Sequence, residues 1–388
     1  MYINILDNFS TIGGYFIPFL FVLTIVVFFH ELGHFLVARL CGVRVLVFSI
    51  GFGPELFGFN DRHDTRWKFA LIPLGGYVKF YGDENAASVP DYAAAATMSE
   101  SERKKSFVHQ SLGNRSAIVA AGPLANFVLA VMIFAAVYSV YGRQLSTPRV
   151  DSVQPNSAAA AAGFQPGDLV LSIDGRAIQS FSDLQRLVSV NAGRTLNVVV
   201  DRGGVQVTLK ATPTLREMKD NFGNVHRIGV LGISRSVQPS DVRVEPVDPL
   251  TAVKLGIEET WFIIERTLSY VGGVIVGREA ADQVGGPARI AQVAGQVWQG
   301  SVSHGGVGQA AIALFQLAAV LSVSIGLINL FPVPLLDGGH LLFYAIEAIR
   351  GRPLSEQAQE IGFRIGLAIV VMLMIFATYN DILHFAGS

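Results

Sequence analysis

The longest apolar stretches of the chain predict four membrane-spanning helices, over about residues 15–40, 116–141, 305–331 and 361–379. The second and third stretches contain no charged residue. The fourth carries Arg364 near one end, where a long side chain can reach the membrane surface. Each stretch approaches or exceeds the roughly 20 residues that a helix needs to cross a bilayer core. We therefore expect a multi-pass α-helical membrane protein.

Between the first two apolar stretches, short alternating segments predict strands over residues 43–50, 67–72 and 77–81. Gly51-Phe52-Gly53-Pro54 and Pro73-Leu74-Gly75-Gly76 separate them and are strong turn signals. Two interpretations remain open for this element. It is either a small sheet that holds a substrate beside a site in the first helix, or a plain cytoplasmic hairpin.

The long segment between the second and third stretches predicts a compact α+β domain. Strands are expected over residues 150–153 and 169–173, helices over 156–162 and 181–190, and a hairpin over 197–210. Ser182 is the expected N-cap of the second helix. With its Ala162-Gly163-Phe164-Gln165-Pro166-Gly167-Asp168 turn, this order resembles a PDZ domain of the type found in bacterial proteases. Residues 249–276 then predict an amphipathic helix at the outer membrane face, because they carry too much charge to span.

Composition supports the membrane prediction. Of the 388 residues, 51% are hydrophobic and 15% are charged, whereas a soluble globular protein carries about 25% charged residues. The net charge of −1 argues against a nucleic-acid partner. The single cysteine, Cys41, excludes both an intramolecular disulfide framework and a thiolate zinc cage.

Basic residues predict the orientation in the membrane. The first fourteen residues contain no Lys or Arg, whereas residues 41–115 contain nine. The positive-inside rule therefore places the N-terminus outside and the 41–115 loop in the cytoplasm. The segment 142–304, which contains the PDZ-like domain, is then expected outside.

Ionisable residues interrupt the first apolar stretch as the motif His30-Glu31-Leu32-Gly33-His34. Such side chains inside a membrane are costly and usually functional. His30 and His34, four residues apart, project from one helical face and can share a Zn²⁺ ion. Glu31 lies on an adjacent face, where it can take a proton from a water molecule at the metal. The pattern therefore predicts metal-assisted hydrolysis.

A hydrolytic zinc site needs a third protein ligand. Asp337 is a better candidate for this ligand than the remaining histidines of the chain. It ends the segment Asn329-Leu330-Phe331-Pro332-Val333-Pro334-Leu335-Leu336-Asp337, where two prolines interrupt the third stretch and two glycines follow. An aspartate on a broken helix at membrane depth suits a ligand that lines a polar cavity. Alternatively, Asp337 caps the next helix, and His340 is then the second choice as ligand.

Together these features resemble the site-2 protease family of intramembrane zinc metalloproteases, and most closely its bacterial branch that regulates sigma-E. The resemblance rests on the HExxH motif in the first span, Gly122-Pro123-Leu124-Ala125-Asn126 in the second, the outer PDZ domain, and the segment ending at Asp337. It implies zinc ligands at His30, His34 and Asp337 and a general base at Glu31. It also implies substrate-binding roles for a further set: Asn329, Gly75, Gly76, Tyr77 and Asn126. Pro123 and Asn126 could equally be a helix kink and an interhelical hydrogen bond.

The expected organisation is a first helix with HExxH (1–41), a membrane-associated β hairpin and cytoplasmic loop (42–115), a second helix (116–142), one PDZ domain (145–213), an outer segment (214–304), a third membrane segment with the aspartate (305–340) and a fourth helix (361–380). Some relatives in this family carry two tandem PDZ domains, whereas this chain shows one.

The resemblance further implies a bacterial inner-membrane protease with Zn²⁺ as cofactor. Its partners would be the lipid bilayer and transmembrane substrates such as anti-sigma factors or signal-peptide remnants, with a site-1 protease acting upstream. Two other classes stay open on the sequence. One is a catalytically silent PDZ adaptor, and the other is a metal-ion transporter that uses His30, His34 and Asp337 as transit ligands.

Overall fold

The computed structural model describes residues 5–82, 97–219, 225–235, 242–277, 281 and 284–387. Part of the predicted cytoplasmic loop, residues 83–96, lies outside the described residues. The chain forms two compact units. The first comprises Met1–Phe134, Gly256–Ile264 and Val284–Gly387, and the second comprises Ala135–Leu255 and Glu265–Gln283.

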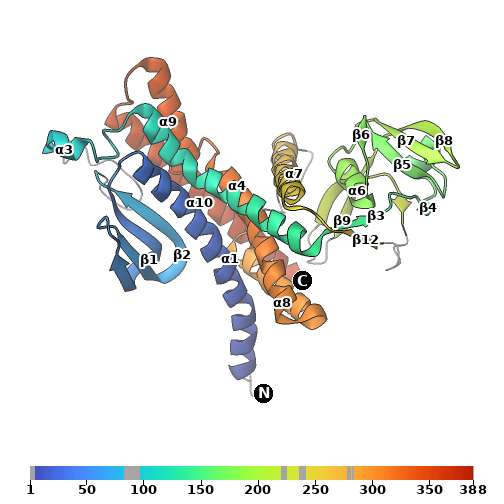
Figure 1. Ribbon diagram of the computed structural model, residues 1–388, viewed down its shortest axis with the longest axis horizontal. Helices are drawn as coiled ribbons and strands as arrows, with labels where there is room; N and C mark the ends of the chain where they lie inside the picture. The colour runs from blue at the N-terminus through green and yellow to red at the C-terminus, as the bar shows by residue number, and fades with distance from the viewer. Residues whose placement is uncertain are drawn as a thin grey trace. The chain divides into compact units, whose positions relative to one another are not determined.

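Four helices are long and apolar enough to cross a membrane, in agreement with the sequence. They are α1 (Ile5–Leu40), α4 (Leu112–Tyr141), α8 (Pro287–Asn329) and α10 (Glu356–Gly387) (Figure 1). Valines of α1 pack on small and apolar residues of α8, with Val22 and Val26 against Leu314 and Ala318.

The predicted third membrane segment, residues 305–340, is divided in the structure. Helix α8 already begins at Pro287, bends at Gly306, where φ is 75°, and ends at Asn329. A loop with two prolines follows, and Asp337 begins a separate helix, α9 (Asp337–Arg350). Proline cannot donate the backbone hydrogen bond that would continue α8, so the helix ends before the predicted ligand.

Strands β1 (Val45–Asn60) and β2 (Arg66–Phe80) form a sheet with four extended stretches (Figure 1). Residues 45–50 pair with residues 76–80 in antiparallel register. Residues 47–50 also pair with residues 66–69, with both residue numbers increasing together, and residues 55–60 pair with residues 66–70 in antiparallel register. The direction of the chain therefore reverses near residues 51–54 and 71–75, at the two predicted turns. Gly51, Gly53 and Gly75 have positive φ there, which favours glycine.

Aromatic stacking fixes this sheet on α1. The Trp67 ring stacks on Phe48 with ring centroids 4.2 Å apart, and Phe35 of α1 meets both rings edge-on at 5.1 and 5.5 Å. Phe48 is fully buried and Phe35 nearly so. The sheet is thus held against the helix that carries the HExxH motif.

The second unit contains a small α/β domain with its own core. Its main sheet has the order β6-β5-β7-β8, formed by Arg176–Ala177, Leu169–Ile173, Leu196–Arg202 and Val205–Ala211. Helices α5 (Ala158–Ala162) and α6 (Phe181–Ser189) accompany the sheet. These elements follow the predicted order. The predicted cap is wrong, because Ser180, not Ser182, accepts the hydrogen bond from Asp183 N at the start of α6.

This domain extends beyond the predicted boundary at residue 213. Strand β11 (Ile233–Ser234) pairs with β4 (Ser152–Val153), and Leu231 is buried in the same core as Val150. The hairpin of β9 (Thr214–Lys219) and β10 (Val225–Val230) lies between. At the ends of the domain, β3 (Arg143–Ser146) pairs with β12 (Val242–Glu245). Long-range pairing of this kind leaves no local signal in the sequence.

Helix α7 (Pro249–Ile275) occupies the predicted amphipathic segment and begins at the N-cap Asp248. It is not among the four described helices that could cross a membrane. A short helix, α3 (Glu100–Arg103), precedes α4.

Candidate metal centre

The structure brings together the three predicted zinc ligands, although they come from two distant parts of the chain. His30 Nε2 lies 3.2 Å from His34 Nε2 and 3.2 Å from Asp337 Oδ2, and His34 Nε2 lies 3.5 Å from Asp337 Oδ1. The three side chains are between 11% and 18% exposed. Two imidazoles and a carboxylate thus converge on one point at which their ligand atoms face one another.

This donor set fits a zinc ion. Tetrahedral zinc with bonds of about 2.0–2.1 Å holds neighbouring donor atoms about 3.3 Å apart, which is close to the three separations measured here. Two histidines and one carboxylate are also a common ligand set of catalytic zinc, which keeps a fourth position open. His30, His34 and Asp337 would therefore hold the ion.

Helix α4 orients the imidazole of His34. The Ile118 carbonyl oxygen lies 2.9 Å from His34 Nδ1 and accepts its proton, which leaves Nε2 free to bind a metal. Two glycines bring the helices close enough for this contact. A Cβ at Gly122 would overlap the His34 ring, and one at Gly33 would overlap the Ala121 carbonyl. The close crossing of α1 and α4 thus depends on the absence of side chains at both positions.

A compact loop presents Asp337 at the first turn of α9. Gly338 and Gly339 pack directly on the backbone carbonyls of the preceding loop, and Gly366 of α10 packs on the Pro334 carbonyl. Leu335 adopts φ of 103°, a conformation that is strained for a side chain other than glycine. The position of the aspartate therefore depends on close backbone packing around the two prolines.

Strand β2 lies beside Glu31. The backbone N–H of Val78 donates a hydrogen bond to the Glu31 carboxylate. A Cβ at Gly76 would lie 3.3 Å from Glu31 Cγ, 3.0 Å from Val27 Cγ1 and 2.7 Å from the Ser49 carbonyl oxygen. Two of the predicted substrate-binding residues, Gly75 and Gly76, thus belong to the stretch that approaches Glu31, and Tyr77 follows them in the strand.

The other predicted site residues lie in different surroundings. Asn126 is fully buried and faces His30, with Asn126 Nδ2 3.2 Å from His30 Nδ1. Asn329 is the last residue of α8 and is half-buried.

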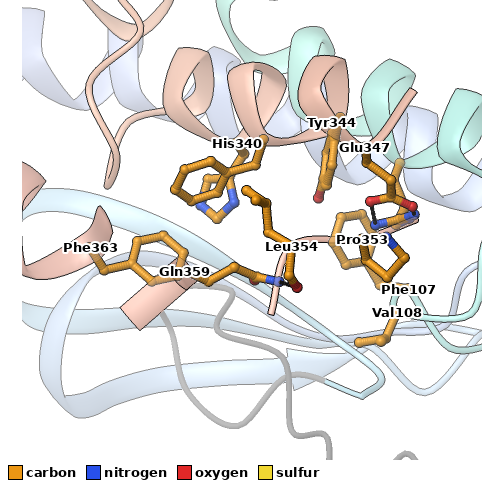
Figure 2. A pocket seen from close by; sticks show the side chains of 11 residues that line it. Phe107, Val108, His340, Tyr344, Glu347, Pro353, Leu354, Gln359 and Phe363 are labelled. Atoms are coloured by element: carbon orange, nitrogen blue, oxygen red, sulfur yellow. Dashed lines mark hydrogen bonds and ion pairs between the residues drawn. The ribbon is translucent and has the colours of Figure 1, made fainter. Parts of the chain in front are cut away.

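His340, the second choice as ligand, is not part of the three-residue group among the described residues. Its ring packs on Phe363 at 5.4 Å and lines a cavity of about 150 Å³ (Figure 2). Opposite His340 the cavity is bounded by the ion pair of Arg115 and Glu347, and the guanidinium of Arg115 lies over the Tyr344 ring. The structure therefore favours Asp337 over His340 as third ligand.

Sequence reasoning missed several residues that shape this centre, namely Gly33, Gly122, Ile118, Ser322 and Gly366. The Gly122-Pro123 pair inside an apolar stretch was a usable signal for a close helix crossing. The contact of the Ile118 carbonyl oxygen with His34 leaves no signal in the sequence, because every residue type has a backbone carbonyl oxygen.

The sequence model described as Peptidase family M50 matches residues 18–373. The chain belongs to this family. That confirms the resemblance to the site-2 proteases, and with it a metalloprotease that uses zinc. The four apolar helices agree with a membrane protein.

Similar proteins include two named zinc metalloproteases and one named metalloprotease MmpA. The first, from Agrobacterium fabrum, is 50% identical over 374 residues, which are 96% of this chain and 97% of that protein. The second, from Rhizobium meliloti, is 52% identical over 379 residues, with coverages of 97% and 98%. MmpA of Caulobacter vibrioides is 42% identical over 379 residues and 94% of each chain. These names favour a protease over the adaptor and the transporter.

One solved structure, the PDZ domain of the SdrC-like protein from Listeria monocytogenes, is 24% identical to part of the chain. The match covers 22% of this chain and 83% of the chain in that structure, with a TM-score of 0.18. The PDZ assignment of the second unit therefore stays a prediction.

Proposed function

We propose that this membrane zinc metalloprotease cleaves transmembrane segments of its substrates inside the bilayer. The observation that carries the proposal is the convergence of His30, His34 and Asp337 in the unit that contains α1, α8, α10 and most of α4, with Glu31 adjacent in the sequence. When bound, zinc acidifies a water molecule and polarises the scissile carbonyl.

The residues of the chain have distinct roles in this proposal. His30, His34 and Asp337 hold the ion. The Glu31 carboxylate takes a proton from the attacking water and returns it to the amine nitrogen of the leaving peptide, so that no net proton is consumed. The Val78 N–H fixes one end of the Glu31 carboxylate toward β2.

A transmembrane helix must be unwound before it can be cut, since all its backbone groups are already hydrogen-bonded. We propose that the substrate is held in extended form beside residues 75–77, the stretch that approaches Glu31. A strand supplies partners for the freed N–H and C=O groups of the peptide. We also retain Asn329 as a candidate substrate contact.

Substitution of Glu31 tests the mechanism. Glu31→Gln should abolish cleavage of a transmembrane reporter and leave the zinc content unchanged, because the ligands stay in place. His34→Ala is the matched control, which should lose both zinc and cleavage. Cleavage by purified Glu31→Gln at a rate near that of the wild type would show that Glu31 is not the base.

We further propose the inner membrane as location, with the N-terminus and the second unit outside and the metal toward the cytoplasm, on the distribution of basic residues. The substrates we propose are anti-sigma factors or similar single-span proteins already shortened by a site-1 protease. The PDZ-like domain would then act as a size filter that excludes substrates with a bulky outer domain.

A further inference from the structure

Asn126 has an unusual environment for an asparagine in an apolar helix. Its side chain is fully buried, Nδ2 lies 3.2 Å from His30 Nδ1, and Oδ1 is buried with no hydrogen-bond partner among the described residues. A buried amide oxygen without a partner costs about 1–3 kcal/mol. The amide oxygen of Asn126 is therefore the atom that needs a hydrogen-bond donor, and His30 is the nearest polar group with which this amide makes contact.

Contacts with α8 fix the backbone at Asn126. Ser322 Oγ of α8 donates a hydrogen bond of 2.9 Å to the backbone carbonyl oxygen of Asn126. Gly326, one turn further along α8, approaches so closely that a Cβ there would lie 3.1 Å from Asn126 Cβ. These contacts hold the backbone of Asn126, and rotation about its Cβ–Cγ bond exchanges the two amide atoms without moving that backbone.

The chemistry of His30 determines which amide atom it needs. Its Nε2 faces His34 and Asp337, so a metal-bound His30 carries its proton on Nδ1. That N–H requires an acceptor, which Nδ2 of Asn126 cannot be. A half-turn of the amide exchanges Nδ2 and Oδ1 with almost no change of shape and places the oxygen against Nδ1.

We propose that Asn126 is a positioning residue that sets the tautomer of His30, with Oδ1 accepting the Nδ1 proton in the zinc-loaded protein. The other ligand shows the same arrangement, since the Ile118 carbonyl oxygen accepts the Nδ1 proton of His34. Helix α4 then orients both histidines. An amide does this without adding a buried charge, which a carboxylate would bring. The proposal rests on the proposed function only in taking His30 as a metal ligand.

Two substitutions separate an acceptor from a donor at this position. Asn126→Leu removes both amide atoms at similar volume, and Asn126→Asp keeps the acceptor but removes the donor. We expect the zinc affinity of Asn126→Leu, measured by chelator competition on purified full-length protein, to fall about 10- to 100-fold. We expect Asn126→Asp to stay within about threefold of the wild type, since it restores the acceptor.

Controls identify a merely structural effect. Leu129→Ala alters a buried residue of the same helix and should reduce thermal stability without changing zinc affinity. His30→Ala should abolish tight binding. Selective ¹⁵N-histidine NMR of the zinc-loaded wild type should show a protonated His30 Nδ1, and that signal is assigned by its absence in His30→Ala.

Three results would overturn the proposal. Equal losses in Asn126→Asp and Asn126→Leu would mean that the amide acts as a donor or only by packing. An unprotonated Nδ1 in the zinc-loaded protein would exclude the acceptor role directly. Unchanged affinity in His30→Ala would remove the ligand on which the argument depends. None of these measurements uses cleavage, so a failure of the proposed proteolysis would be recognised separately.

Discussion

Gly122 of α4 lies against the imidazole of His34, so closely that any side chain at position 122 would overlap the ring. The geometry of the candidate metal centre therefore depends on a glycine in a neighbouring helix as well as on the three proposed ligands. This contact leads to a direct test.

Gly122→Ala should push the His34 ring away from Asp337 and weaken zinc binding by about tenfold or more, in the range of changes that disturb a ligand from outside. Overpacking should also cost about 1–3 kcal/mol of stability. Gly113→Ala is a matched control in the same helix, since a Cβ at Gly113 meets nothing within 4 Å. Unchanged zinc affinity in Gly122→Ala would show that the helices can separate without moving the ligand.

The assignment of the third ligand can be tested by comparing two neighbouring residues. Asp337→Ala should lower zinc affinity more than about 100-fold, beyond the range of outer-shell changes. His340→Ala should leave it within about threefold, because the His340 ring packs on Phe363 and lines the cavity. Chelator competition measures both. Full zinc occupancy in Asp337→Ala together with loss in His340→Ala would reverse the assignment.

Gly76 offers a test of the contact between the sheet and Glu31. Gly76→Ala places a methyl group 2.7 Å from the Ser49 carbonyl oxygen and 3.3 Å from Glu31 Cγ, so either the strand or the carboxylate must move. A displacement of about 1 Å can cost about 100-fold in rate. We expect kcat for a transmembrane reporter to fall while zinc content stays unchanged. A normal kcat would mean that the strand does not constrain Glu31.

Asp61 connects the turn between β1 and β2 to the end of α1. Its carboxylate accepts hydrogen bonds from the backbone N–H groups of His63 and Thr65, from Trp67 Nε1 and from Arg39 at the end of α1. Burial alone would raise the pKa of Asp61, but these donors outweigh it and lower the pKa to about 2. The lowered pKa corresponds to about 2 kcal/mol of stability.

Because the folded-state pKa of Asp61 lies below the unfolded value, its contribution is fully present above about pH 4 and is lost as the pH falls toward 2. Asp61→Asn should therefore lower the thermal stability at pH 7, and the difference from the wild type should shrink below pH 4. Asp64→Asn, in the same turn but with a side chain 78% exposed, should have little effect. A difference that is constant down to pH 2.5 would contradict this account.

The sequence predicted those parts of the centre that depend on local geometry. Spacing of four residues places His30 and His34 on one helical face wherever that helix lies, and the prolines before Asp337 marked the break in α8. Apolar length was likewise enough to find all four helices. These features follow from the chain within one or two turns of the residue concerned.

The parts that could not be predicted depend on which elements meet. The role of Asn126 toward His30 requires the register of α4 on α1, which no local pattern encodes. The start of α8 at Pro287 was hidden because polar residues such as Gln296 and His304 occupy its first half. The domain boundary at 213 was misplaced because β11 returns to pair with β4.

The corrected boundary also improves the test of the proposed size filter. Strands β3 and β12 enter and leave the small domain side by side, with Gln144 opposite Val244. Paired strands lie about 5 Å apart, so a short flexible linker can join the chain after excision. Removing residues 147–241 deletes the whole core of the domain, whereas deleting the predicted range 145–213 would leave β11 and Leu231 without partners.

We expect the excised protein to keep its zinc, because all three ligands lie in the other unit. It should also cleave substrates whose outer domain is still attached, which the full-length protein should reject, and it should cut trimmed substrates at an unchanged rate. Metal analysis and a pair of reporters with and without a folded outer domain measure these outcomes. A zinc-loaded, folded deletion variant that still cuts only the trimmed reporter would show that substrate size is sensed elsewhere, with α7 as the first candidate.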